Sequence, residues 1–360
     1  MEALATFRMN RREIYYWKCD RPAAFHATQP HGEAKKSLSA ALKTELQRHF
    51  GSSNVVMSPG AGQGNHLTWN AEVDGMPCFI RVENGPEKDT HLAVESTLLD
   101  CVRAAGVSTP RVFGCDASRR QVPFAWQALE RISAPDLNHW FKRGTLQVPT
   151  IAFEIGVAVA KWQEITLERF GVLDEHLRGF RESYADYFHL RLDEHLRFLT
   201  KSGFWVKPDE IRSEIENHRA LMDLPQGCLV HKDLALWNIL GTEQQIAAFI
   251  DFDDAICGDP MDDLSLLACF HDALFLQRAF EGYQSVRRLP DDHLRRFWLH
   301  LLRNMIVKAV IRVGAGYFDH DDSFFLIGSG SSGATLRETT LAKLTTALRG
   351  LREGAGLDIL

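Results

Sequence analysis

The spacing of apolar residues changes twice along the chain, near residue 54 and near residue 136. Apolar residues recur every four positions from Lys35 to Phe50, which predicts one amphipathic helix. After Asp136 the spacing again becomes mainly helical. Between these two regions, short apolar runs bounded by turns predict strands at Val55–Met57, Leu67–Val73, Met76–Val82 and Val122–Leu129, with a helix at Asp89–Ala105. The pattern therefore predicts an α+β chain in which a small antiparallel sheet precedes a helical region that includes Ile151–Phe170, Asp291–Val313 and Ala334–Leu351.

Composition limits the classes of protein to which the chain can belong. Its 360 residues are 45% hydrophobic, enough for a substantial core, and its net charge of -6 argues against a nucleic-acid-binding protein. The seven cysteines form no C-x-x-C pair, which indicates free thiols in a reducing compartment. No apolar run has the length of a signal-peptide core at the N-terminus or of a membrane span. We expect a soluble, cytoplasmic protein without membrane or nucleic-acid partners, and leave its oligomeric state open.

The candidate chemistry lies in one stretch, Cys228–Leu264. An apolar run leads into Asp233, Asn238 follows five residues later, and Asp251 ends a second apolar run. Phosphoryl transfer from a nucleotide needs a carboxylate that orients and deprotonates the attacking hydroxyl, and oxygen ligands for magnesium. We predict that Asp233 is the base and that Asn238 and Asp251 are catalytic ligands of Mg²⁺.

The spacing of the two predicted ligands has a structural explanation. Ile239-Leu240 and Ala247–Ile250 flank a short polar turn and predict a two-stranded hairpin. Such a hairpin returns the chain, so that Asn238 at its start and Asp251 at its end lie side by side. Asp233, on the preceding loop, then faces the same spot.

Two strings of residues carry a resemblance to a known family. His231–Leu240 reads H-x-D-L-x-x-x-N-I-L, and Ile250–Leu264 reads I-D-F-x-x-A-x-x-G-D-P-x-x-D-L. Both resemble the aminoglycoside phosphotransferase and choline-kinase-like small-molecule kinases. The resemblance implies a two-lobed protein-kinase-like fold, with an antiparallel-sheet N-lobe and a mainly helical C-lobe. It also implies transfer from ATP or GTP to a hydroxyl of a small-molecule substrate. Between Asp251 and Gly258 the chain has no room for the activation segment of a protein kinase.

In the N-lobe the resemblance points to residues that would hold the nucleotide phosphates. Gly60, Gly62 and Gly64 lie in a turn between two predicted strands, where backbone N–H groups can approach phosphate. Kinases place a lysine on the third strand to hold phosphates and to pair with a helix glutamate. Here that cation is Arg81, which can pair bidentately, and its expected partner is Glu95.

The resemblance also assigns residues at the lobe junction and behind the catalytic loop. We expect the adenine to bond the backbone of a hinge at Gln127–Glu130, which includes Leu129. Asp263 would hydrogen-bond the backbone of the catalytic loop, and His231 would support this loop from below. Both would act as structural residues behind the reacting groups.

Three segments can be distinguished along the chain: an N-terminal arm (1–34), a nucleotide-binding N-lobe (35–131) and a C-lobe with the catalytic loop and substrate site (132–360). The arm contains three consecutive aromatic residues, Tyr15–Trp17, which would pack along the domain or else form a dimer contact or a lid over the substrate. Lys232, Asp253 and Asp254 are charged residues close to the predicted catalytic residues in the sequence, and their roles stay open.

Three functions fit these residues. The first is phosphorylation of an aminoglycoside-type antibiotic, which would confer antibiotic resistance. The second is a metabolic kinase for an amino alcohol, amino acid or sugar. The third is a catalytically silent pseudokinase that only binds, against which the intact catalytic positions argue. The acidic residues from Asp174 to Glu194 either form a solvated helix face or attract a cationic substrate.

Overall fold

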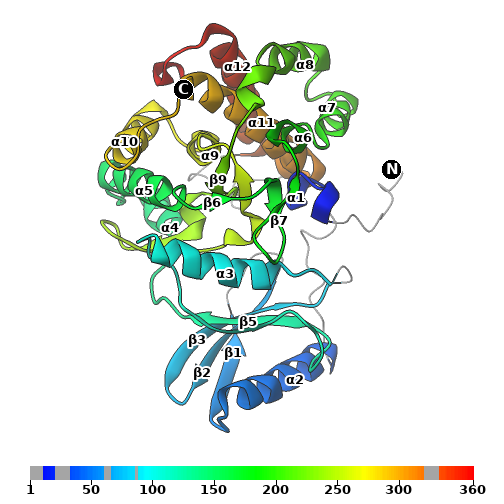
Figure 1. The fold of residues 1–360 in the computed structure, drawn as a ribbon, viewed down its shortest axis with the longest axis vertical. Coiled ribbons are helices and arrows are strands. Elements are labelled where there is room, and N and C mark those ends of the chain that lie inside the picture. Colours follow the sequence, from blue (N-terminus) through cyan, green and yellow to red (C-terminus); the bar gives the residue numbers. More distant parts are fainter. Residues whose placement is uncertain (1–10, 21–32, 61–65, 86–87, 320–331) are drawn as a thin grey trace.

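A five-stranded antiparallel sheet and a larger helical region make up the fold in the computed structural model, which describes residues 11–20, 33–60, 66–85, 88–319 and 332–360 (Figure 1). Asp74 and Gly75 both have positive φ, as a tight two-residue hairpin turn requires. They join two strands of the sheet, which has the order β1-β2-β3-β5-β4. The strands are β1 (Val55–Pro59), β2 (Leu67–Val73), β3 (Met76–Glu83), β4 (Val112–Asp116) and β5 (Ala125–Glu130).

Two helices pack on this sheet, and they belong to different cores. Helix α2 (Glu33–Phe50) buries Leu42 and Leu46 in the core of the sheet region. Helix α3 (His91–Ala104) lies between the sheet and the helical region (Figure 1), and its Leu98 belongs to the main core, which is continuous with the helical region. Helix α3 therefore couples the two lobes mechanically.

The C-lobe combines helices with a second, smaller antiparallel sheet of order β6-β9-β12-β7-β8 and with the separate β10–β11 hairpin. Its strands are β6 (Thr166–Leu167), β7 (Phe170–Leu173), β8 (Gly179–Arg181), β9 (Gly227–Val230), β10 (Ile239–Gly241), β11 (Ile246–Phe249) and β12 (Ile256–Gly258). Its helices are α4 (Leu137–Lys142), α5 (Val148–Trp162), α6 (Tyr184–Phe188), α7 (Leu192–Lys201), α8 (Pro208–Asn217), α9 (Asp262–Ala268), α10 (Ala273–Gln284), α11 (His293–Gly314) and α12 (Gly333–Glu353).

The helix expected over Ile151–Phe170 is wrong in its second half. Helix α5 ends at Trp162, and β6 and β7 follow within eight residues. These short strands are stabilised by pairing with β9 and β12, which lie far away in the sequence. Over such short apolar runs the helical and extended patterns cannot be told apart, because the pairing partner decides between them.

The N-terminal segment Arg11–Asp20 packs on the C-lobe. It ends in α1 (Trp17–Asp20), which lies against α11 (Figure 1), and the side chains of Tyr15 and Tyr16 are buried in the main core. The three segment boundaries inferred from the sequence stay a prediction. No helix in the described ranges is both long and apolar enough to cross a membrane. The seven cysteines are all described and are free thiols.

Helices α5 and α10 cross at close range because each contributes a glycine. A Cβ at Gly156 would lie 1.9 Å from the backbone oxygen of Ala279, and one at Gly282 would lie 2.0 Å from that of Phe153. Backbones this close leave no space for any side chain, so the crossing depends on both glycines.

We predict that Gly156→Ala lowers the free energy of unfolding by about 1–3 kcal/mol or more, because the added methyl group must push the two helices apart. Chemical denaturation of the purified variant would measure this loss. Gln277→Ala, at an exposed position of α10, is the matched control and should leave the stability nearly unchanged. Equal stability of the Gly156 variant and the control would contradict the tight crossing.

Candidate active site

One carboxylate holds the loop that follows β9. Asp263, in the first turn of α9, accepts hydrogen bonds from the backbone N–H groups of His231 (3.0 Å) and Lys232 (3.1 Å). The indole N–H of Trp162 donates to the same carboxylate at 3.0 Å. Lys232 has a φ of 68°, a left-handed conformation that is costly for a residue with a side chain. The converging bonds fix this strained loop.

The ring of His231 supports the same loop from its other side. Its Nε2 bonds the backbone oxygen of Ile250 at 3.0 Å, and its Nδ1 accepts from the backbone N–H of Asp233 at 3.3 Å. An imidazole that donates at one nitrogen and accepts at the other is neutral, with its proton on Nε2. His231 and Asp263 thus make the supporting contacts that the sequence analysis expected of them.

The three predicted catalytic residues are brought together by the β10–β11 hairpin. The amide of Asn238 donates to the backbone oxygen of Asp233 at 2.8 Å and to its Oδ2 at 3.2 Å. The N–H of Ile250 donates to the backbone oxygen of Asn238 at 3.1 Å, where the hairpin closes. Asp251 is the next residue, so it lies beside Asn238 at the mouth of the hairpin.

The available donor atoms fit a divalent cation. The amide nitrogen of Asn238 is used by Asp233, which leaves its Oδ1 as a ligand. Asp251 uses Oδ1 to bind Arg81, and its side chain is 35% exposed. Burial, and next the charge of Asp253, raise the pKa of Asp251. This crowding of negative charge is what a bound Mg²⁺ would relieve.

Arg81 connects the N-lobe sheet to these acids. Its guanidinium pairs with Glu95 from α3, with Asp251 at 2.8 Å and with Asp253 at 3.1 Å. The expected partnership of Arg81 and Glu95 is present. Glu95 also accepts from the backbone N–H of Phe252 at 3.2 Å. Burial opposes the charge on Arg81, yet the surrounding carboxylates outweigh it and raise the pKa of the guanidinium. The lobes therefore meet through buried charges.

The predicted glycine turn is only partly described. Gly60 directly follows β1, and its N–H donates to the backbone oxygen of Thr68 at 3.0 Å. A Cβ at Gly60 would lie 2.7 Å from the Thr68 hydroxyl oxygen, so the close approach of the two strands requires glycine. Gly62 and Gly64 lie outside the described residues.

The predicted hinge residues lie within the sheet. Gln127 is fully buried, and its side-chain amide donates to the Ser96 hydroxyl on α3 at 2.9 Å. The main chains of Gln127 and Leu129 lie between β3 and β4 and pair with both. The N–H groups of Glu130 and Arg131 donate to the backbone oxygens of Arg111 and Pro77, so N–H groups free to bind an adenine would begin after Arg131, beyond the predicted hinge.

The structure assigns Lys232 a role that the sequence left open. Its ammonium group is buried and donates to Asp262 at 2.7 Å, to the Tyr15 hydroxyl at 3.0 Å and to Asn304 at 3.2 Å. All three donor positions of the ammonium group are thus used. Lys232 joins the loop after β9 to the N-terminal segment and to α11.

Asp253 and Asp254 also have protein partners. Asp253 pairs with His66 at 2.9 Å in addition to Arg81. Asp254 accepts from the indole N–H of Trp17 at 2.7 Å. Burial, and next the charge of Asp253, raise the pKa of Asp254. Trp17 thus holds the N-terminal segment over the acids of the site.

Two lysines at the catalytic centre had no signal in the sequence. Lys18 donates to Oδ2 of Asp233 at 2.8 Å, and the ammonium of Lys308 lies 3.7 Å from Oδ1. Burial opposes ionisation of Asp233, but these two cations outweigh it and lower the pKa of the carboxyl group. An isolated lysine belongs to no motif, so its place beside Asp233 follows only from the folded chain.

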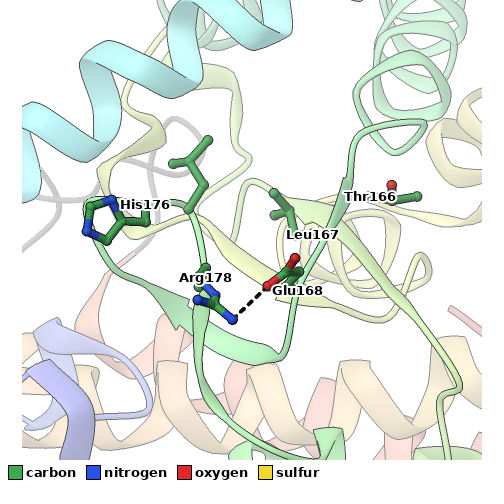
Figure 2. A pocket seen from close by; sticks show the side chains of 6 residues that line it. Thr166, Leu167, Glu168, His176 and Arg178 are labelled. Carbon is green, nitrogen blue, oxygen red and sulfur yellow. Dashed lines mark ion pairs between the residues drawn. The ribbon is translucent and has the colours of Figure 1, made fainter.

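A separate surface pocket lies on the C-lobe and has a volume of about 290 Å³ (Figure 2). The ion pair between Glu168 and Arg178 crosses it at 2.8 Å, and both side chains are more than half exposed. Exposed pairs of this kind contribute little to stability or binding. The pocket shares no residue with the catalytic loop, and we assign it no function. Its lining consists of Thr166, Leu167, Glu168, His176, Leu177 and Arg178.

We predict that Asp263→Ala lowers both the free energy of unfolding and the activity, because three buried N–H donors lose their acceptor. Each buried donor without a partner costs about 1–3 kcal/mol. Denaturant unfolding and hydrogen exchange of the His231 and Lys232 amides would measure the effect. Asp223→Ala, at an exposed position, is the control. Unchanged protection of both amides would contradict the supporting function of Asp263.

Comparison with known proteins agrees with this geometry. The model of the phosphotransferase enzyme family matches residues 58–298 of the 360-residue chain. A search among curated proteins found no match. Several solved structures have a similar fold, and their low sequence identities make this a likeness of fold alone.

Three of these structures illustrate the range of the likeness. The first is a thermostable mutant of aminoglycoside phosphotransferase APH(4)-Ia in a ternary complex with ADP and hygromycin B; it is 16% identical, has a TM-score of 0.60, and covers 88% of this chain and 99% of its own. A protein from Haemophilus somnus 129PT assigned as a fructosamine-3-kinase is 13% identical, with a TM-score of 0.58 and coverage of 85% and 97%. Spectinomycin phosphotransferase APH(9)-Ia, in complex with ADP and spectinomycin, is 15% identical, with a TM-score of 0.52 and coverage of 89% and 95%.

These findings confirm the two-lobed kinase-like fold and the family resemblance that the sequence motifs predicted. The matched segment contains the N-lobe strands β2 to β5, the loop after β9 and α9. With more than half of its length matched, the chain belongs to the phosphotransferase enzyme family.

Proposed function

We propose that this phosphotransferase moves the γ-phosphoryl group of ATP, or of GTP, to a hydroxyl group of a small molecule. One observation carries the proposal: Asp233 lies against Asn238 and beside Asp251, and its Oδ1 has no hydrogen-bond partner among the described residues. A buried carboxylate oxygen without a donor is costly unless a ligand supplies one. The hydroxyl group of an acceptor would be that donor.

In this mechanism Asp233 orients the acceptor hydroxyl and removes its proton. The hydroxyl oxygen forms a bond to the γ-phosphorus, the bond from that phosphorus to the leaving oxygen of the nucleotide breaks, and the proton passes to the Asp233 carboxylate. Asn238 holds the carboxylate in place through its amide. Most of the rate enhancement would come from this positioning and from charge neutralisation.

Asn238 Oδ1 and one oxygen of Asp251 are the atoms that would hold Mg²⁺, which when bound neutralises phosphate charge. Arg81 would hold the nucleotide phosphates from the N-lobe, with Glu95 fixing its direction. Gly60 directly follows β1, at the start of the proposed phosphate turn. The complexes of two similar folds with ADP support nucleotide binding by this chain.

The acceptor would be a small molecule that carries a reactive hydroxyl group. The neighbouring structures with hygromycin B and spectinomycin support a polar, hydroxyl-rich small molecule. An antibiotic kinase and a metabolic kinase would share the same catalytic residues, so the surroundings of Asp233 must distinguish them. A pseudokinase is disfavoured because Asn238 contacts Asp233 and Asp251 follows the hairpin that begins beside Asn238.

We predict that Asp233→Asn lowers kcat by roughly 10²- to 10⁴-fold, because the amide keeps the shape of the side chain but cannot take the proton. Nucleotide consumption by the purified protein, with Mg²⁺ and a panel of hydroxyl compounds, would measure the loss. Asp223→Asn, at an exposed site, serves as the control. Full activity in the Asp233 variant would show that another group is the base.

Asp251→Ala should abolish turnover while the protein stays folded, because a partly exposed metal ligand is lost but the hairpin is kept. The rate as a function of Mg²⁺ concentration would test this, together with a thermal melt. Raising Mg²⁺ should not restore the variant to the level of the unchanged protein. Normal activity at ordinary Mg²⁺ concentrations would refute the metal assignment.

A further inference from the structure

The N-terminal segment is a fixed wall of the catalytic centre. Asp20 accepts from the backbone N–H groups of Tyr15 (2.7 Å) and Tyr16 (3.1 Å), which caps the turn, and it pairs with His195 of α7 at 2.7 Å. The hydroxyl of Tyr187 donates to the backbone oxygen of Tyr15 at 2.9 Å. These buried contacts hold the segment beside α11, as Figure 1 shows for α1. Of the alternatives considered from the sequence, these contacts correspond to an arm packed along the domain.

The side chains of Asp233, Tyr16 and Lys308 come from three different parts of the fold and lie close together, and each lacks a complete set of hydrogen-bond partners. The hydroxyl of Tyr16 lies beside the Asp233 carboxylate and interacts with it, but in the described part of the chain neither this hydroxyl nor Oδ1 of Asp233, both buried, has a partner with normal hydrogen-bond geometry. The side chain of Lys308 on α11 is only 10% exposed, and its ammonium lies 3.7 Å from Oδ1, beyond hydrogen-bonding distance. Buried polar groups are normally satisfied, so this cluster has the composition of a ligand site.

The charge of this cluster is unusual for a site that receives a polycation. Lys18 and Lys308 both face the carboxylate of Asp233, and the charges of Asp254 and Asp251 also act on Lys18. The rings of Tyr16 and Phe270 flank the Lys308 ammonium at 5.4 and 5.3 Å. A desolvated cation of this kind favours an anionic partner.

The nearby acids Asp253 and Asp254 already have partners within the protein. Asp254 is bound by Trp17, and Asp253 is bound by Arg81 and His66. The acidic zone that the sequence analysis considered as an attraction for cations lies on the surface instead. Its members Glu182 and Asp193 are exposed and pair with arginine side chains.

The two lysines also restrict access to the Asp233 carboxylate, which is a second reason to expect an anionic acceptor. Lys18 occupies Oδ2 of Asp233, and Lys308 faces Oδ1. An acceptor that carries a carboxylate gives a lysine another partner, so the lysine can leave Asp233 and expose it to the hydroxyl. A cationic acceptor would repel both lysines without replacing the contact that they lose.

We propose that Tyr16, Lys18 and Lys308 form the acceptor pocket with Asp233, and that the acceptor is a hydroxy compound with a carboxylate near its reactive hydroxyl. This inference rests on the proposed phosphotransfer function and narrows its substrate class. Tyr16, Lys18 and Lys308 all lie outside the segment that matches the family, residues 58–298, whereas Asp233 lies within it.

The test uses acceptors that differ only in the carboxylate: glycerate against glycerol, and 4-hydroxybutyrate against 1,4-butanediol, with hygromycin B as the cationic acceptor. The full chain with MgATP should give a kcat/KM at least about tenfold higher for one acid than for its alcohol, since a charged hydrogen bond has that worth. Lys308→Met should remove this preference by lowering kcat/KM for the acid alone. Lys308→Arg should retain it, and Lys201→Met, at an exposed position, is the matched control.

Several results would overturn the inference. Equal turnover of acids and alcohols, or preferred turnover of hygromycin B, would do so with the unchanged protein, whether or not the variants fold. An equal loss for acid and alcohol in Lys308→Met would assign this lysine to the nucleotide instead. In each of these cases the protein still transfers phosphoryl groups in a reaction that depends on Asp233, so the proposed function stands. Absence of transfer to every acceptor, with Asp233→Asn as the blank, would count against the function itself.

Discussion

The active site depends on the hydrogen bonds that converge on the carboxylate of Asp263. This residue begins α9, yet it holds the backbone of the loop after β9 and the indole of Trp162 at the end of α5. The loop is strained at Lys232, and a strained backbone persists only where its surroundings fix it. The position of Asp233 is therefore set by the packing of α5 and α9, well outside the loop itself.

Electrostatic balance is the second constraint on the site. Acids gather where the lobes meet, because phosphate transfer needs metal ligands and a base in one place. The compensating cations come from separate parts of the fold: Arg81 from the sheet, Lys18 from the N-terminal segment and Lys308 from α11. In a buried site each cation is worth more than at the surface. The site is thus complete only when both lobes and the N-terminal segment are folded together.

Much of the fold could be predicted where local chemistry decides the structure. Asp74-Gly75 specifies a tight hairpin, and the strands on both sides were placed within about one residue. The β10–β11 hairpin could be inferred in the same way, and with it the closeness of Asn238 and Asp251. The strands β6 and β7 could not, because their extended conformation depends on pairing with β9 and β12.

The sequence by itself predicted the proposed catalytic group, since Asp233, Asn238 and Asp251 are joined by one short loop and one hairpin. Only the tertiary structure decided what surrounds that group. Lys18 meets Asp233 across 215 positions of sequence, and no periodicity or motif encodes such a contact. The same holds for Lys232, whose partners are chosen by the packing of α11 and the N-terminal segment. Local spacing fixes which atoms can react, whereas the meeting of distant elements fixes which molecule can reach them.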